Sequence, residues 1–155
     1  MGVEIERKFL VDLKKIDLNS LKSTAIKQYY LLNEETRSIR LRISNKDAYL
    51  TIKTNKTPIK RNEYEYTIPI QEALTLAADF KDKDHIEKTR YFYDHKDHLW
   101  EIDVFHSKNS GLVVAEIELL SEDESFEKPE WIKEEVTNDT RYLNANLVKH
   151  PFSEW

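Results

Sequence analysis

The chain has 155 residues, 39% of them hydrophobic and 34% charged, and this length fits one domain with a single core over residues 1–155. Its formal net charge of -5 argues against a nucleic-acid-binding protein held by a basic face. The absence of cysteine excludes disulfides, thiolate metal sites and a cysteine nucleophile. Because the only glycines are Gly2 and Gly111, glycine-rich phosphate loops are excluded as well, so side chains would have to bind any phosphate.

Targeting and membrane signals are absent from the sequence. The N-terminal residues include charges within the first four positions and lack an apolar stretch of signal-peptide length. No run approaches the roughly 18 apolar residues that a membrane span requires. We therefore expect a cytoplasmic protein with no membrane or nucleic-acid partner, and a monomer and a homodimer both stay open.

Alternation of apolar and polar residues dominates the chain, and this period of two predicts half-buried β-strands. Two of the segments, 27–32 and 86–93, alternate less regularly but are rich in the aromatic and β-branched residues that strands favour. The links between strands are short and polar, which predicts antiparallel hairpins. The predicted strands cover residues 3–11, 27–32, 37–44, 48–54, 61–68, 86–93, 98–105 and 112–120.

Helical patterns are few. Residues 71–80 place their apolar side chains on one helix face, and Ser121 with Glu124 matches a capping box that would open a short helix. Near the end, Asp139 or Thr140 would cap a helix that includes Leu143 and Leu147. Together these patterns predict an α+β domain dominated by an antiparallel sheet.

The polar faces of the predicted strands hold an unusual concentration of full charges two residues apart. Residues two apart on a strand point the same way, with Cα atoms ~6.5–7 Å apart. Paired carboxylates can bind one hard divalent cation, and paired Arg or Lys can hold successive phosphate groups. The acidic positions are Glu4 and Glu6, Glu63 and Glu65, Glu116 and Glu118, and Asp103; the basic positions are Lys8, Arg40 and Arg42, Lys53, Lys88 and Arg90.

For any single pair, a solvated outer face without function is the simpler interpretation, but it does not explain the whole set. Eight strands tend to close into a barrel because closure removes exposed edges. Helical segments could then cover the apolar faces and leave the charged faces pointing inward. Acidic pairs facing basic pairs inside a barrel suit a chelated metal together with a polyanion.

The segment Glu4-Ile5-Glu6-Arg7-Lys8 resembles the ExExK signature of the CYTH superfamily, the triphosphate tunnel metalloenzymes, in its small single-domain bacterial form. The resemblance continues in order to about residue 147, through the segments at 28–31, 40–42, 50–53, 63–65, 87–91, 103–105, 115–119 and 135–142. It implies an eight-stranded antiparallel closed β-barrel with a few flanking helices. It also implies a charged tunnel in which Mg²⁺ or Mn²⁺ assists hydrolysis of a triphosphate.

The resemblance also implies roles for individual residues. Lys8 and Tyr30 correspond to a catalytic pair, although Tyr29 stands where the family often has glycine. Glu4, Glu6, Glu116 and Glu118 would be metal ligands, while Glu63, Glu65 and Asp103 would serve a second metal or position the water. The phosphates would be bound by Arg40, Arg42, Lys53, Arg61, Lys88 and Arg90.

We therefore expect a metal-dependent triphosphatase that hydrolyses inorganic tripolyphosphate by attack of water on a terminal phosphate. Either a carboxylate or the Lys8–Tyr30 pair could activate this water. The alternatives within the superfamily are a nucleoside or thiamine triphosphatase and an adenylate cyclase, which would need a pocket for the base or thiamine. An alternative of another class is a non-catalytic module that binds polyphosphate.

Overall fold

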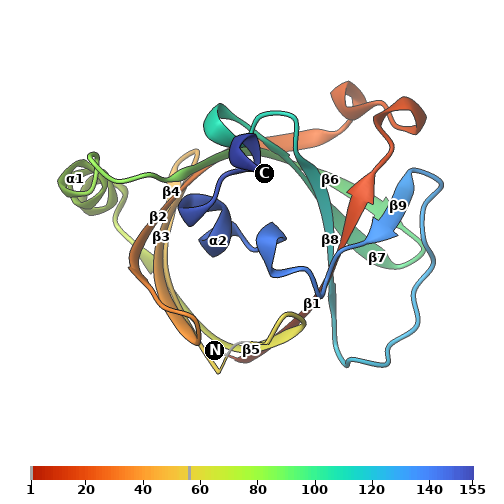
Figure 1. Cartoon of the computed structure of the whole chain (residues 1–155), viewed down its shortest axis with the longest axis horizontal. Coiled ribbons are helices and arrows are strands. Elements are labelled where there is room, and N and C mark those ends of the chain that lie inside the picture. The colour runs from red at the N-terminus through yellow and green to blue at the C-terminus, as the bar shows by residue number, and fades with distance from the viewer. Residues whose placement is uncertain (1, 56) are drawn as a thin grey trace.

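The computed structural model describes residues 2–55 and 57–155, and over these residues nine antiparallel strands form one sheet that closes on itself (Figure 1). The first eight strands make a closed barrel, so the predicted fold is confirmed. The strands are β1 (Gly2–Val11), β2 (Lys22–Asn33), β3 (Arg37–Ser44), β4 (Asp47–Thr54), β5 (Lys60–Ile68), β6 (Ile86–His95), β7 (His98–Phe105), β8 (Val113–Leu119) and β9 (Ile132–Glu135).

The strand β1 closes the barrel. Around the sheet the order is β5-β4-β3-β2-β6-β7-β8-β1-β9, and the start of β1 also pairs with β5 at Gly2–Ile5. Further along, residues Ile5–Leu10 pair with β8, while Phe9 and Val11 pair with β9. One strand therefore joins both ends of the ring and also holds the extra strand outside it.

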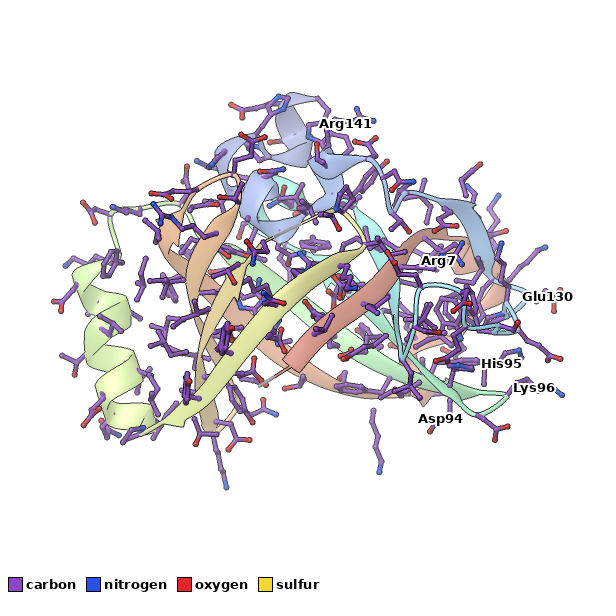
Figure 2. All side chains as sticks on the ribbon, turned by 90° about the horizontal axis from the view of Figure 1, so that it is seen from below. Arg7, Asp94, His95, Lys96, Glu130 and Arg141 are labelled. Atoms are coloured by element: carbon purple, nitrogen blue, oxygen red, sulfur yellow. The ribbon has the colours of Figure 1, made fainter. Side chains whose placement is uncertain are left out.

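The hairpins are tight, as the short polar links predicted. Asn45 has a φ of 52° in the β3–β4 turn, and Lys96 and Asp97 have φ values of 49° and 66° in the β6–β7 turn. Asn and Asp tolerate this left-handed region better than most residues. In Figure 2 the turn at Asp94–Lys96 lies on the side of the molecule opposite the long helix α1.

Two strands differ from the sequence prediction. The strand β2 begins at Lys22 rather than at residue 27, because residues 22–28 pair with β6. The short β9 escaped prediction because its four residues show no apolar alternation, and its pairing with β1 joins segments more than 100 residues apart in the chain.

The helix α1 (Ile70–Asp79) agrees with the prediction, but the other helix predictions need correction. Residues Ser121 to Glu124 form a turn instead of opening a helix, since Glu124 Oε1 turns back to accept the Leu120 N–H at 2.7 Å. Asp139 caps a single 3₁₀ turn, and α2 (Asn144–Lys149) starts only after Leu143. Over residues 2–55 and 57–155, no helix has the length and apolar character needed to cross a membrane.

The apolar strand faces point out of the barrel and are covered there. Ala73 and Ala77 of α1 pack on Leu41 and Ala48 of β3 and β4. On the other side, Phe126 and Trp131 of the long loop pack with a buried cluster on β1, β7 and β8. This cluster includes Trp100 and Phe9, which are 0% exposed. The covering of both outer faces leaves the polar faces inside.

One end of the barrel interior is apolar. Ile86 lies two residues before Lys88 on β6, and Val114 lies two residues before Glu116 on β8, so both share the inward face. They form a buried cluster with Leu147 of α2. Figure 1 shows α2 within the outline of the ring of strands. The C-terminal segment thus closes this end of the barrel interior.

Candidate active site

The barrel encloses a cavity of about 210 Å³, several times the volume of one water molecule. Its lining holds carboxylates and cations in equal number, contributed by β1, β3, β4, β5, β6, β7 and β8. The carboxylates are Glu4, Glu6, Glu63, Glu65, Glu101, Glu116 and Glu118, and the cations are Lys8, Arg40, Arg42, Lys53, Arg61, Lys88 and Arg90. Strands far apart in the sequence therefore bring nearly all of the predicted charged residues to one place.

Asp103 is the exception among the predicted site residues. It is 0% exposed and does not line the cavity. Its Oδ1 accepts from Arg90 Nε at 2.7 Å, and its Oδ2 accepts from Lys88 Nζ at 2.7 Å. Because both oxygens are engaged behind these cations, the placement argues against the expected roles in metal binding or water positioning. Asp103 instead fixes Lys88 and Arg90 in position.

We call Glu4, Glu6, Glu63, Glu116 and Glu118 the acidic wall; they lie on the neighbouring strands β5, β1 and β8. Most of these carboxylates already contact cations of the cavity. The carboxylate of Glu4 lies 2.8 Å from Lys53 Nζ, and Arg61 Nη2 donates to Glu6. Arg61 Nε is also 2.9 Å from Glu4 Oε2, although its N–H does not point at that oxygen.

Lys8 lies in the middle of this wall. Its Nζ donates to Glu6 Oε1 at 2.9 Å and to Glu116 Oε1 at 2.6 Å. Burial alone would lower the pKa of Lys8, but the carboxylates of Glu116 and Glu6 outweigh burial and raise the pKa above its usual value. Lys8 is therefore a permanent cation at neutral pH and a poor proton acceptor.

Glu118 differs from the rest of the wall because it has no ion-pair partner among the described residues. Partial burial, together with the nearby Glu4 and Glu63, raises its pKa to about 7. Such a surplus of oxygen donors and negative charge is what a hard divalent cation neutralises. The donor set therefore fits a metal, although no three acidic or histidine side chains of residues 2–55 and 57–155 are already gathered around one point.

We call Arg40, Arg42, Lys88 and Arg90 the basic wall; they lie across the barrel on β3 and β6, which flank β2. Among the cations of the cavity, Arg42 alone has no carboxylate within 4.0 Å in the described part of the chain. Burial, and then repulsion from Arg40 and Arg90, lowers the pKa of Arg42 to about 10. A half-buried guanidinium without a carboxylate partner among the described residues favours binding of an anion.

Two other members of this wall, Arg40 and Lys88, also have an unused donor or a repelled positive charge. Arg40 Nη2 donates to Thr51 Oγ1 at 3.3 Å, but its buried Nε has no hydrogen-bond partner. Burial, opposed by Asp103 and reinforced by Arg90 and Arg42, lowers the pKa of Lys88 to about 7. An anion between these side chains would relieve the repulsion between them.

Tyr30 lies in the cavity lining next to the basic wall, opposite Arg40 in the pairing of β2 with β3. The register of this pair shifts only after Tyr30, between Tyr30 and Leu32. Tyr29 points the other way and stacks on His85, with 4.8 Å between the ring centroids. The bulky residue at position 29 is thus accommodated outside the barrel, and Tyr30 keeps its inward direction.

Three polar residues of the lining were not predicted: Ser38, Glu101 and Asn144. The signal for Glu101 was present, because it lies two residues before Asp103 on the same strand face and directly opposite Glu116. Ser38 shares the inward face of β3 with Arg40. No strand periodicity marks Asn144, since only the docking of α2 brings it to the cavity.

Comparisons with known proteins agree with this site and fold. The family model of the CYTH domain matches residues 2–152. The chain is 45% identical over 157 residues to an inorganic triphosphatase of Acetivibrio thermocellus, covering 100% of this chain and 99% of that protein.

A second relative, an inorganic triphosphatase of Nitrosomonas europaea, is 36% identical over 149 residues, which cover 94% of this chain and 96% of that protein. A crystal structure of an inorganic triphosphatase superimposes with a TM-score of 0.67 at 36% identity, covering 96% of this chain and 95% of the other. With the barrel, its charged interior and matches over nearly its whole length, the chain belongs to the CYTH domain family.

Proposed function

We propose that this chain is an inorganic triphosphatase that hydrolyses tripolyphosphate with the help of a divalent metal. The observation that supports it most directly is the cavity itself, in which an acidic wall faces a basic wall and each has one charge, Glu118 or Arg42, without an ion-pair partner in the described part of the chain. Relatives of full length, one of them 45% identical, are inorganic triphosphatases, which favours the same activity here.

The basic wall would bind the phosphate chain. Arg40 and Arg42 have guanidinium N–H groups free for bidentate contacts, and Lys88 and Arg90 are held in place by Asp103. Lys53 and Arg61 would add further positive charge once Glu4 and Glu6 turn to another ligand. Asp103 fixes Lys88 and Arg90 before the substrate arrives, and such preorganised donors provide electrostatic stabilisation of a phosphoryl-transfer transition state.

The acidic wall would hold the metal. Glu4, Glu6, Glu116 and Glu118 are the proposed ligands, with Glu63, Glu65 and Glu101 close enough on the lining to assist. A bound Mg²⁺ or Mn²⁺ would supply positive charge against the phosphate oxygens and favour a nucleophilic water at neutral pH. Either ion fits the all-oxygen donor set.

Lys8 and Tyr30 would act without taking a proton. Because Lys8 stays protonated between Glu6 and Glu116, it would stabilise the charge that develops on the reacting phosphate. Tyr30 would add a hydroxyl donor from the opposite side. Proton acceptance from the attacking water would then fall to a carboxylate of the acidic wall.

The alternative substrates within the superfamily are less well supported. A nucleoside or thiamine triphosphatase and an adenylate cyclase would need a platform on which a ring can stack. Among the described residues that line the cavity, Tyr30 is the one aromatic side chain, and it lies within the charged part. Monomer or homodimer assembly and a cytoplasmic location stay predictions.

Phosphate release tests the proposal. Tripolyphosphate, ATP, GTP and thiamine triphosphate would each be incubated with Mg²⁺, with Mn²⁺ and with EDTA. We expect the highest kcat/KM on tripolyphosphate and no turnover in EDTA. Faster turnover of a nucleotide would favour the nucleoside triphosphatase, whereas tight binding without phosphate release would favour the non-catalytic module.

A further inference from the structure

Asn144 connects the C-terminal helix to the basic wall. It is the first residue of α2 and lines the closed end of the cavity together with Leu143 and Ala145. Its Oδ1 accepts two hydrogen bonds, from Lys88 Nζ at 2.8 Å and from Gln28 Nε2 at 3.1 Å. A neighbouring bond from Asn33 Nδ2 to the carbonyl of Ala145, at 2.8 Å, fixes α2 against β2.

Gln28 links Asn144 to Arg42. It is 0% exposed, and its Oε1 accepts from Arg42 Nε at 2.9 Å. The directions of both amides follow from Arg42, because a guanidinium only donates. Gln28 must therefore turn its oxygen to Arg42 and its Nε2 to Asn144, so Asn144 must turn its oxygen to Gln28 and Lys88.

This arrangement leaves one group of Asn144 unused. With Oδ1 facing Lys88 and Gln28, Nδ2 is directed away from them, and it has no acceptor among residues 2–55 and 57–155. The two terminal nitrogens of the Arg42 guanidinium, Nη1 and Nη2, likewise lack a protein acceptor there, since Gln28 takes only the Nε–H. The closed end of the cavity therefore presents donors from two residues that are linked through Gln28, and among residues 2–55 and 57–155 no carboxylate lies within 4.0 Å of the Arg42 guanidinium.

We propose that Asn144 is a substrate-binding residue: its Nδ2 donates to an oxygen of a terminal phosphoryl group that Arg42 also binds, while its Oδ1 holds Lys88 in place. Gln28 is a positioning residue that aligns Asn144 with Arg42. The proposal rests on the proposed function for the identity of the ligand, a triphosphate. It makes docking of α2 part of the phosphate-binding site, so that this end of the cavity recognises a free phosphate terminus.

The variant Asn144→Asp separates this role from a structural one. Aspartate keeps an oxygen for Lys88 and for Gln28, so α2 stays docked and the Lys88 contact gains an ionic component. The free Nδ2 donor, however, becomes an oxygen that repels phosphate. A second variant, Asn144→Ala, removes both groups. The matched control is Asn146→Ala, which lies on the same helix but donates to the carbonyl of Thr140 rather than lining the cavity.

The measurements are Kd for tripolyphosphate in EDTA by titration calorimetry, KM and kcat for phosphate release with Mg²⁺ or Mn²⁺, and Tm. We expect Asn144→Asp to keep the wild-type Tm and to raise Kd and KM at least ~10-fold, with a smaller change in kcat. Asn144→Ala should raise both by about 10-fold, and Asn146→Ala should leave them unchanged.

Wild-type Kd and KM in Asn144→Asp would overturn the proposal while leaving the triphosphatase activity intact. An equal rise in Asn146→Ala would also overturn it, because the effect would then come from the helix in general. Wild-type protein that binds tripolyphosphate but releases no phosphate would overturn the proposed function alone, since the Kd comparison would still decide the role of Asn144. Wild-type protein that does not bind tripolyphosphate would overturn both.

Discussion

The two walls of the cavity have opposite excess charge. On the acidic wall, carboxylates crowd together and the pKa of Glu118 is raised to about 7. On the basic wall, cations crowd together and the pKa of Lys88 is lowered to about 7, that of Arg42 to about 10. The acidic wall has excess negative charge, which favours binding of a metal cation. The basic wall has excess positive charge, which favours binding of a phosphate anion.

A solvated or fully paired interior would not show this imbalance. Where a structural ion pair is complete, as between Asp103 and Arg90, the pKa of the acid is lowered and that of the base is raised. Both walls contain such pairs, but each also has one charged group without an opposite partner among the described residues, Glu118 and Arg42. These two groups are where the comparison between the walls can be tested.

The largest effect should follow loss of the unpaired acid. Glu118→Gln replaces a proposed metal ligand by a weaker one and removes no ion pair of the described residues, so the fold should be retained. Replacement of Glu4 or Glu6 would instead leave buried cations without their partners. We expect kcat/KM to fall at least ~1000-fold, more than ~4 kcal/mol in transition-state stabilisation.

Steady-state kinetics at a series of Mg²⁺ and Mn²⁺ concentrations would measure this loss. The matched control is Glu122→Gln, on the exposed loop outside the cavity. Wild-type kinetics in Glu118→Gln, or wild-type turnover that persists in excess EDTA, would contradict a metal-binding acidic wall.

Replacement of Lys8 tests whether the stability and activity of the acidic wall depend on the cation between its carboxylates. Lys8→Met keeps most of the side-chain volume but leaves Glu6 and Glu116 without their shared partner. We expect ~3–5 kcal/mol lower stability in denaturant unfolding. In the folded fraction we expect a lower kcat and little change in KM, because the interaction would be made chiefly in the transition state.

The exposed Lys14→Met provides the control for an added methionine. A folded Lys8→Met variant with the wild-type kcat would remove Lys8, and with it the Lys8–Tyr30 pair, from the reaction.

Arg42 tests the basic wall. Arg42→Ala should raise KM ~10- to 100-fold, since each charge-assisted contact to phosphate is worth ~1.5–3 kcal/mol. Because Arg42 has no carboxylate partner in the described residues, no acid is left unpaired, and loss of the hydrogen bond to Gln28 Oε1 should lower stability by only ~1–3 kcal/mol. Arg37→Ala, on the same strand but exposed and paired with Glu34, should leave KM unchanged. An unaltered KM in Arg42→Ala would refute phosphate binding at this wall.

The smallest effect is the exchange of protons on ligand binding, and its sign should differ between the walls. Near pH 7, Glu118 is about half protonated, so a divalent cation that lowers its pKa should release up to ~0.5 proton. Lys88 is also about half protonated there, so an anion that raises its pKa should take up a similar fraction. Titration calorimetry in buffers of different ionisation enthalpy measures both. The same sign for metal and tripolyphosphate would contradict the opposed walls.

Much of the site could be predicted because a strand places its side chains by a simple rule. The alternation of Glu4, Glu6 and Lys8 with apolar neighbours already put these three on one face, and the barrel confirms that this face points inward. The same rule gave Arg40 and Arg42. For Asp103 it gave the direction of the side chain but not its depth behind Lys88 and Arg90, which parity does not fix.

What the sequence determined by itself is local: eight of the nine strands, their polar faces, the helix α1, and a surplus of paired charges that an open sheet does not need. The tertiary structure decided what depends on contacts between distant segments. It determined the pairing of β9 with β1, the docking of Asn144 against Gln28, and which two charges of the cavity, Glu118 and Arg42, have no ion-pair partner within residues 2–55 and 57–155. The alternation of apolar and polar residues cannot predict such contacts. Burial, ion pairing and pKa depend on neighbouring side chains that only the closed barrel brings together.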